Sequence, residues 1–155
     1  KISRYQDYAR FKRICETTLP IASLEIDFYD GKNWNYPEDF FKKLLIFKDS
    51  LKVLKINRML IVRDIDVIEI GNIFQELTYL QDVEVHGLGN SVSTPIKDES
   101  LIRWAGIMAA KNTKLQTFVL SHSEGFYKPE VLTQFKQILS PTVSNVIIKP
   151  WLGLQ

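Results

Sequence analysis

The chain has 155 residues, of which 45% are hydrophobic, 12% aromatic and 25% charged. This balance is typical of one folded domain and excludes a disordered chain, and no apolar run approaches the ~20 residues of a membrane-spanning helix. The 20 Lys and Arg against 18 Asp and Glu leave a formal charge of +2, which excludes a strong overall attraction to nucleic acid or to an anionic membrane.

Five helices are predicted along the chain, each followed by a short apolar segment. In the fourth, Leu101, Trp104, Ala105 and Met108 follow the i, i+3, i+4, i+7 spacing of one buried stripe. Pro129 stands where a helix begins without losing a needed N–H. The predicted helices are Arg4–Glu16, Glu38–Lys48, Asp66–Glu76, Glu99–Lys111 and Glu130–Leu139.

The apolar segments between the helices share one pattern: apolar, two variable residues, apolar, one variable residue, apolar. The pattern predicts a short strand at each occurrence, and strands that are each preceded by a helix should run parallel. It occurs at Ile21, Leu24 and Ile26; Leu51, Leu54 and Ile56; Leu80, Val83 and Val85; Leu115, Phe118 and Leu120; and Val143, Val146 and Ile148.

The recurrence predicts an α/β solenoid of about five repeats, with a parallel sheet on the concave face and helices on the convex face. The repeats span residues 1–29, 30–59, 60–88, 89–123 and 124–151. The alternative is a compact doubly wound α/β domain, whose units recur at similar spacing. Polar residues such as Glu25 and Glu84 alternate with the apolar ones, which favours a sheet with one buried face.

Two stretches resemble known leucine-rich repeats. Ile107–Leu120 (IMAAKNTKLQTFVL) is similar to the helix-to-strand junction of ribonuclease-inhibitor-like and tropomodulin-like repeats, and Leu44–Ile56 (LLIFKDSLKVLKI) resembles that of F-box leucine-rich-repeat proteins. The resemblance implies a protein-binding scaffold, and in F-box proteins the repeats select the substrate of a ubiquitin ligase. One feature departs from the family, which usually places Asn or Cys three residues after the last strand leucine; here these positions hold Tyr29, Met59, Leu88, Ser123 and Trp151.

The side chains between the core positions of each strand form the candidate binding face. We expect it to be acidic at one end and apolar at the other, with Val119 and Ile147 exposed, and to dock a protein partner that carries basic and apolar groups. The alternative is a solvated sheet face without a partner. The candidate residues on the strands are Glu25, Asp27, Lys55, Asn57, Asp82, Glu84, His86, Val119, Ser121 and Ile147.

Two aromatic residues, Trp34 and Tyr36, follow the first predicted strand. Tyrosine and tryptophan are favoured anchors of protein interfaces, so both are candidate binding residues. The alternative is that they cap the edge of the sheet.

Catalysis is not expected, although His86 and Ser121 are predicted to lie side by side on adjacent strands. A hydrolytic relay would also need an acid on the far imidazole nitrogen and an oxyanion hole, and the residue expected on that far side is Asn57. This leaves a hydrolase as a remote alternative. With Cys15 as the only cysteine and only two histidines, we expect no disulfide, metal or cofactor, and an intracellular, cytoplasmic or nuclear location.

The start of the chain is basic, with Arg10, Lys12 and Arg13 among aromatic residues. The favoured interpretation is a first helix that caps the stack, with Tyr8 and Phe11 pointing inward. The less favoured one is that this segment contacts nucleic acid. A nucleic-acid-associated or cytoskeletal regulatory subunit is therefore kept as an alternative function. Because the chain starts without Met or a signal-peptide core, we interpret it as a fragment of a longer protein.

Overall fold

The computed structural model describes residues 2–3, 8–17, 19–27, 41–57, 64–88, 97–110, 114–122 and 127–151. Strands and helices alternate along these residues, as the repeat predicts. In chain order they are β1 (Ile2–Ser3), α1 (Tyr8–Cys15), β2 (Ser23–Asp27), η2 (Phe41–Phe47), β3 (Val53–Asn57), α2 (Asp64–Glu76), β4 (Asp82–Leu88), α3 (Asp98–Met108), β5 (Thr117–His122), α4 (Pro129–Leu139) and β6 (Asn145–Pro150).

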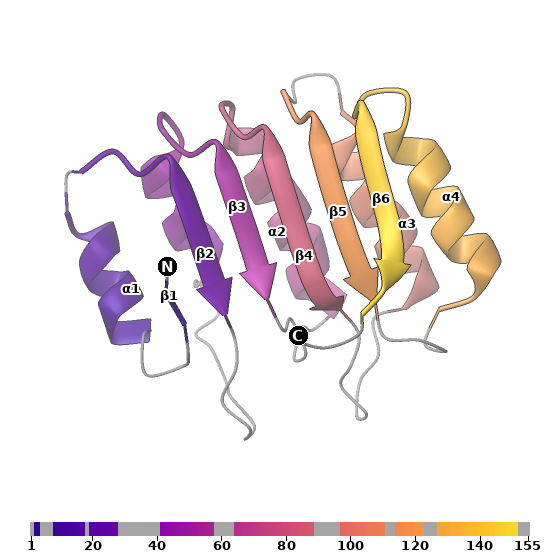
Figure 1. The fold of residues 1–155 in the computed structure, drawn as a ribbon, viewed down its shortest axis with the longest axis horizontal. Helices are drawn as coiled ribbons and strands as arrows, with labels where there is room; N and C mark the ends of the chain where they lie inside the picture. Colours follow the sequence, from indigo (N-terminus) through magenta and orange to yellow (C-terminus); the bar gives the residue numbers. More distant parts are fainter. Residues whose placement is uncertain are drawn as a thin grey trace.

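The strands form one parallel sheet in the order of the sequence, β1-β2-β3-β4-β5-β6. Neighbouring helices contact one another in the same order, and the helix layer stands on one side of the sheet (Figure 1). A doubly wound domain reverses its strand order at a switch point and carries helices on both faces. That alternative is therefore wrong, and the prediction of an α/β fold with a parallel sheet is confirmed.

The predicted core positions meet in register between the sheet and the helices. Leu54 pairs with Leu24 on one side and with Val83 on the other, and Phe118 pairs with Val83 and Val146. All five side chains are buried. The core residues of neighbouring strands thus lie side by side. Because side chains alternate between the two faces of a sheet, the residues between the core positions of each strand line up in the same way on the opposite face.

An aromatic cluster joins the last helices to the sheet. The ring centroid of Trp104 in α3 lies 5.6 Å from that of Phe118 in β5 and 5.7 Å from that of Phe135 in α4. The Trp104–Phe118 pair has an interplanar angle of 81°, the edge-to-face arrangement that aromatic quadrupoles favour. These contacts fix α3 and α4 against β5.

The helices follow the predictions closely, with one difference in type. Pro129 occupies the first turn of α4, as predicted. The segment Phe41–Phe47 is a 3-10 helix and not an α-helix. Its buried residues Phe41, Leu44 and Phe47 recur every three positions, which suits the three residues per turn of that helix.

The first unit has one strand that was not predicted. Ile2 and Ser3, which precede the predicted helix Arg4–Glu16, form a strand that pairs with Ile26 and Asp27. A strand of two residues is too short to show an alternation of polar and apolar side chains, so no sequence pattern predicts it.

Among the described residues, none of the helices has the length and apolar character needed to cross a membrane.

Candidate protein-binding face

The sheet face opposite the helices carries the predicted rows of side chains. The central row runs Glu25, Lys55, Glu84, Val119 and Ile147 across β2 to β6, each paired with its neighbour. In a second row, nearer the ends of the strands, Asp27 pairs with Asn57. In the same row His86 pairs with Ser121, and Ser121 pairs with Lys149. The predicted register of the candidate residues is thereby confirmed.

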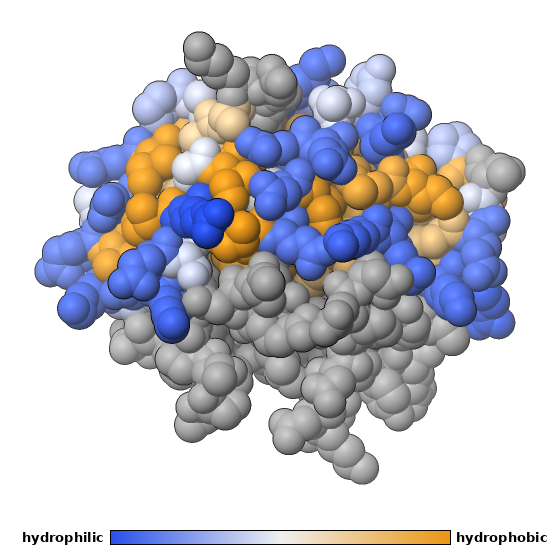
Figure 2. Space-filling model, turned by 180° about the vertical axis from the view of Figure 1, so that it is seen from behind, coloured by the Kyte–Doolittle hydropathy of each residue, from blue (hydrophilic) through white to orange (hydrophobic). Residues whose placement is uncertain are grey.

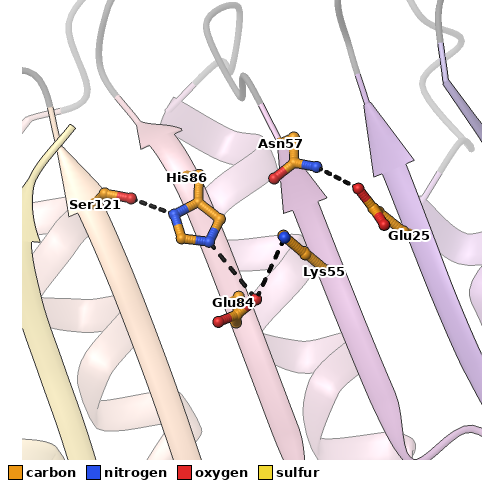
Figure 3. Close-up of polar contacts among 6 residues, drawn as sticks. All are labelled: Glu25, Lys55, Asn57, Glu84, His86 and Ser121. Atoms are coloured by element: carbon orange, nitrogen blue, oxygen red, sulfur yellow. Dashed lines mark hydrogen bonds and ion pairs between the residues drawn. The ribbon is translucent and has the colours of Figure 1, made fainter. Parts of the chain in front are cut away.

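Two carboxylates of this face contact a cation and an amide of the same face (Figure 3). One oxygen of Glu84 lies 3.9 Å from Nζ of Lys55. Asn57 donates a hydrogen bond of 2.8 Å from Nδ2 to Oε1 of Glu25. The acidic character that the strand register predicts for this face is therefore partly compensated within the sheet, which leaves a mixed charged surface.

Each ring nitrogen of His86 makes a polar contact, one across to β5 and one within β4. Nδ1 is hydrogen-bonded to Oγ of Ser121 in β5, and Nε2 lies 3.7 Å from the Glu84 carboxylate (Figure 3). Burial lowers the pKa of His86 below the ordinary 6.5, Lys55 and Lys149 act in the same direction, and Glu84 opposes them. At neutral pH the ring is therefore neutral, with one nitrogen donating and one accepting.

The glycine after His86 adopts a backbone conformation that other residues rarely take. Gly87 has a φ of 80°, in the left-handed region. The pairing of β4 with β5 shifts register between His86 and Leu88 at the same point. This irregularity ends the regular ladder directly after His86, as bulges commonly do near the end of a strand.

Three candidate residues are buried, contrary to the expectation of an exposed face. Val119 is 5% exposed, Asn57 3% and Ser121 1%. The prediction that Val119 is exposed is wrong, because it lies in an inner strand between Glu84 and Ile147 of the central row. Ile147 itself is 39% exposed, in agreement with its prediction. These three side chains therefore offer little contact area to a partner.

The accessible part of this face is smaller than predicted, and we call it the docking face. Lys55 and Glu84 each have side chains that are 40% exposed. Val53, which is not among the candidate binding residues, is 37% exposed; its alternation with Leu54 predicts that it lies on this face. The docking face comprises Glu25, Val53, Lys55, Asp82, Glu84 and Ile147.

Some candidates fall outside what the structure describes. Trp34 and Tyr36 lie outside the described residues, and of Asp27 only the backbone in β2 is described. In the basic first helix, Phe11 is fully buried while Lys12 and Arg13 are exposed. The expected inward orientation of Phe11 is thereby confirmed, and it matches a helix that packs on the stack.

The residues of the remote hydrolase alternative are arranged differently from the prediction. The group on the far nitrogen of His86 is Glu84, where Asn57 was expected. Ser121, the residue that would act as nucleophile, is 1% exposed. The geometry suits a cross-strand polar contact better than an acyl-transfer site, which needs an accessible nucleophile and oxyanion donors.

No group of three or more metal-ligating side chains is placed to hold an ion within the described ranges. The opposite, helix-side surface mixes hydrophobic and hydrophilic residues (Figure 2), and Ile46 of η2 is 54% exposed. The helix side is therefore the second large surface that a partner can reach.

No protein-family model, no curated protein and no solved structure matches this chain, so its function has to be argued from this geometry.

Proposed function

We propose that this chain is a leucine-rich-repeat solenoid domain that acts as a non-enzymatic protein–protein interaction module, with its partner bound on the docking face. One observation carries the proposal. The helix layer stands on one side of the sheet, while on the other side the side chains of Lys55, Glu84 and Ile147 are about two-fifths exposed.

The arrangement of the units supports a solenoid. Each described strand from β2 to β5 lies between the strands that precede and follow it in sequence, and the helix layer keeps the same order. Among the described elements the main contacts join successive units, as in repeat proteins. The resemblance of Leu44–Ile56 to F-box repeats adds a narrower proposal: this domain selects substrates for an intracellular ubiquitin ligase.

The chemistry of the docking face indicates the kind of partner. Asp82 and Glu84 favour a basic group, and Val53 and Ile147 offer apolar contact on either side of the carboxylates. Charged groups at the border of an interface set orientation and association rate, whereas apolar contacts contribute most of the affinity. A partner segment with a Lys or Arg close to an aliphatic or aromatic residue therefore fits best.

A charge reversal at one position tests the proposal. Glu84→Lys should weaken binding of the natural partner, because it places a cation opposite the partner's basic group and beside Lys55. The matched control is Glu76→Lys, the same change at an exposed position in the last turn of α2, on the helix layer. The partner is first cross-linked in extract of the source cells, identified and purified, and its affinity is then measured for both variants by calorimetry.

Circular dichroism and urea unfolding verify that both variants fold. Loss of affinity for Glu84→Lys with retention for Glu76→Lys supports the docking face. Equal affinity for both variants, or loss only for Glu76→Lys, contradicts it.

A further inference from the structure

The two edges of the sheet are unlike each other. At one edge β1 contributes only two residues, Ile2 and Ser3, and short edge strands resist further pairing. At the other edge lies β6, with six residues, and among the described strands it pairs only with β5. A full-length strand edge offers backbone donors and acceptors to another chain.

The backbone of β6 shows which groups face outward. Asn145 donates its N–H to the carbonyl of Gln116 at 2.9 Å, and Trp151 donates to the carbonyl of His122 at 2.7 Å, both toward β5. Because backbone groups alternate in direction along a strand, Val146 and Ile148 present their N–H and C=O groups on the outer side. Pro150 also faces outward but has no N–H, so a ladder on this edge ends there.

The side chains of β6 leave aliphatic area uncovered on both faces of the sheet. On the core face, Ile148 is only partly buried, whereas Leu120, its partner in β5, is fully buried. On the other face, Ile147 is 39% exposed, whereas its partner Val119 is 5% exposed. A further strand beside β6 that carries aliphatic residues on both faces would cover them.

We propose that this further strand is β6 of a second copy of the chain, paired antiparallel across a two-fold axis to form one continuous sheet. In the register that fits best, Ile147 lies opposite Ile147 of the second copy. Val146 then lies opposite Ile148, and Asn145 opposite Lys149. The outward-facing residues Val146 and Ile148 thus form the hydrogen-bonded pairs of the new ladder, and each pair exchanges both N–H···O=C bonds.

Three features make β6 complementary to itself in this register. The aliphatic pairs fall on both faces, no like charges stand opposite each other, and Pro150 lies beyond the hydrogen-bonded pairs. Cross-strand aliphatic pairs stabilise a sheet, whereas like charges placed directly opposite destabilise it. A two-fold pairing uses the same patch on both copies, the commonest symmetry of protein oligomers. The inference does not depend on the proposed function.

A cysteine at the two-fold axis tests the register. Residues of a non-hydrogen-bonded antiparallel pair have Cα atoms about 4.5 Å apart, close enough for a disulfide. Ile147→Cys should therefore form a disulfide-linked dimer on mild oxidation, seen on a non-reducing gel. The matched control is Val53→Cys, equally exposed on the same face but in the inner strand β3. The native Cys15 does not compete, because it is buried and burial raises its pKa to about 11.

Charge variants give an independent readout of association in solution. Sedimentation equilibrium of the unmodified chain should show a concentration-dependent mass that approaches twice 18.0 kDa. Ile147→Lys should abolish the dimer because it places two lysines opposite each other, and Val53→Lys should leave it intact. Mixing Ile147→Lys with Ile147→Glu should restore a dimer of one copy of each. A monomer at all concentrations, or cross-linking of Val53→Cys as readily as of Ile147→Cys, overturns the proposal.

Discussion

The carboxylate of Glu84 lies 3.7 Å from Nε2 of His86, two residues further along the same strand. The other ring nitrogen is hydrogen-bonded to Ser121 of β5, and the same carboxylate reaches Lys55 of β3. Polar contacts of His86 and Glu84 thus connect three neighbouring strands on the face opposite the core. They set the positions of the charged side chains that the proposed partner would meet.

The pH dependence of stability tests the environment of His86. Burial lowers the pKa of this residue below 6.5 in the folded chain, so just below that pH the unfolded chain binds more protons than the folded one. The contribution of His86 to the free energy of unfolding is therefore complete above pH 6.5 and is lost as the pH falls below it. Urea unfolding at a series of pH values measures this change.

The variant His86→Gln isolates that contribution, because an amide can still hydrogen-bond Ser121 and does not titrate. As the pH decreases, the free energy of unfolding of the natural chain should fall relative to that of H86Q. A constant difference across the range, or a shift in favour of the natural chain, would show that the pKa of His86 is not lowered.

Adjacent residues of β3 test the register of the sheet. Leu54 is fully buried, so Leu54→Asp places an unpaired charge in the core and should unfold the chain. Val53 is 37% exposed, so Val53→Asp should remain folded. Circular dichroism and denaturant unfolding distinguish the two variants. If both variants fold, or if only Val53→Asp unfolds, the assignment of the two faces is wrong.

Two helical glycines form a matched pair that tests how α2 packs on α3. A Cβ at Gly71 would lie 2.8 Å from Cδ1 of Trp104 and 3.1 Å from Cγ2 of Ile107, whereas one at Gly106 would have no atom within 4 Å. Gly71→Ala should destabilise the chain by about 1–3 kcal/mol through overpacking. Gly106→Ala should stabilise it by about 0.5–1 kcal/mol, since alanine favours a helix. Thermal unfolding checks both, and equal effects would contradict the packing.

The hydrogen bond between Asn57 and Glu25 predicts a rescue by exchange of donor and acceptor. Asn57 is 3% exposed, so Asn57→Asp brings a second carboxylate against Glu25 and should cost about 1–3 kcal/mol or more. In the double variant E25Q/N57D an amide again faces a carboxylate, and most of the loss should be recovered. A double-mutant cycle by urea unfolding measures this, and additive losses would argue against a direct contact.

The strand register could be predicted from the sequence because it depends on local alternation. Leu24, Leu54, Val83 and their equivalents enter the core, so their neighbours had to face the other side, and the rows followed. The contact between Glu84 and His86 was also accessible, because residues two apart on a strand share a face. The prediction put Glu84 on the same surface as His86, but it assigned the far side of the imidazole to Asn57, where the structure has Glu84.

Other features needed the folded chain. The burial of Val119 and Ser121 depends on what the neighbouring strands and the rest of the molecule place over them, which alternation does not encode. The strand at Ile2–Ser3 has too few residues for any periodicity. The difference between an α-helix and a 3-10 helix at Phe41–Phe47 depends on how Phe41, Leu44 and Phe47 fit against the core.

Site-specific photo-cross-linking tests most directly whether the sheet face binds a protein. A photoreactive amino acid replaces Lys55 on the docking face in one variant and Ile46, 54% exposed on the helix side, in another, and cross-linked proteins are identified from the source cells. One partner should be cross-linked from position 55, be lost when Glu84→Lys is added, and not be captured from position 46. Capture of that partner from position 46 and not from position 55 would contradict it.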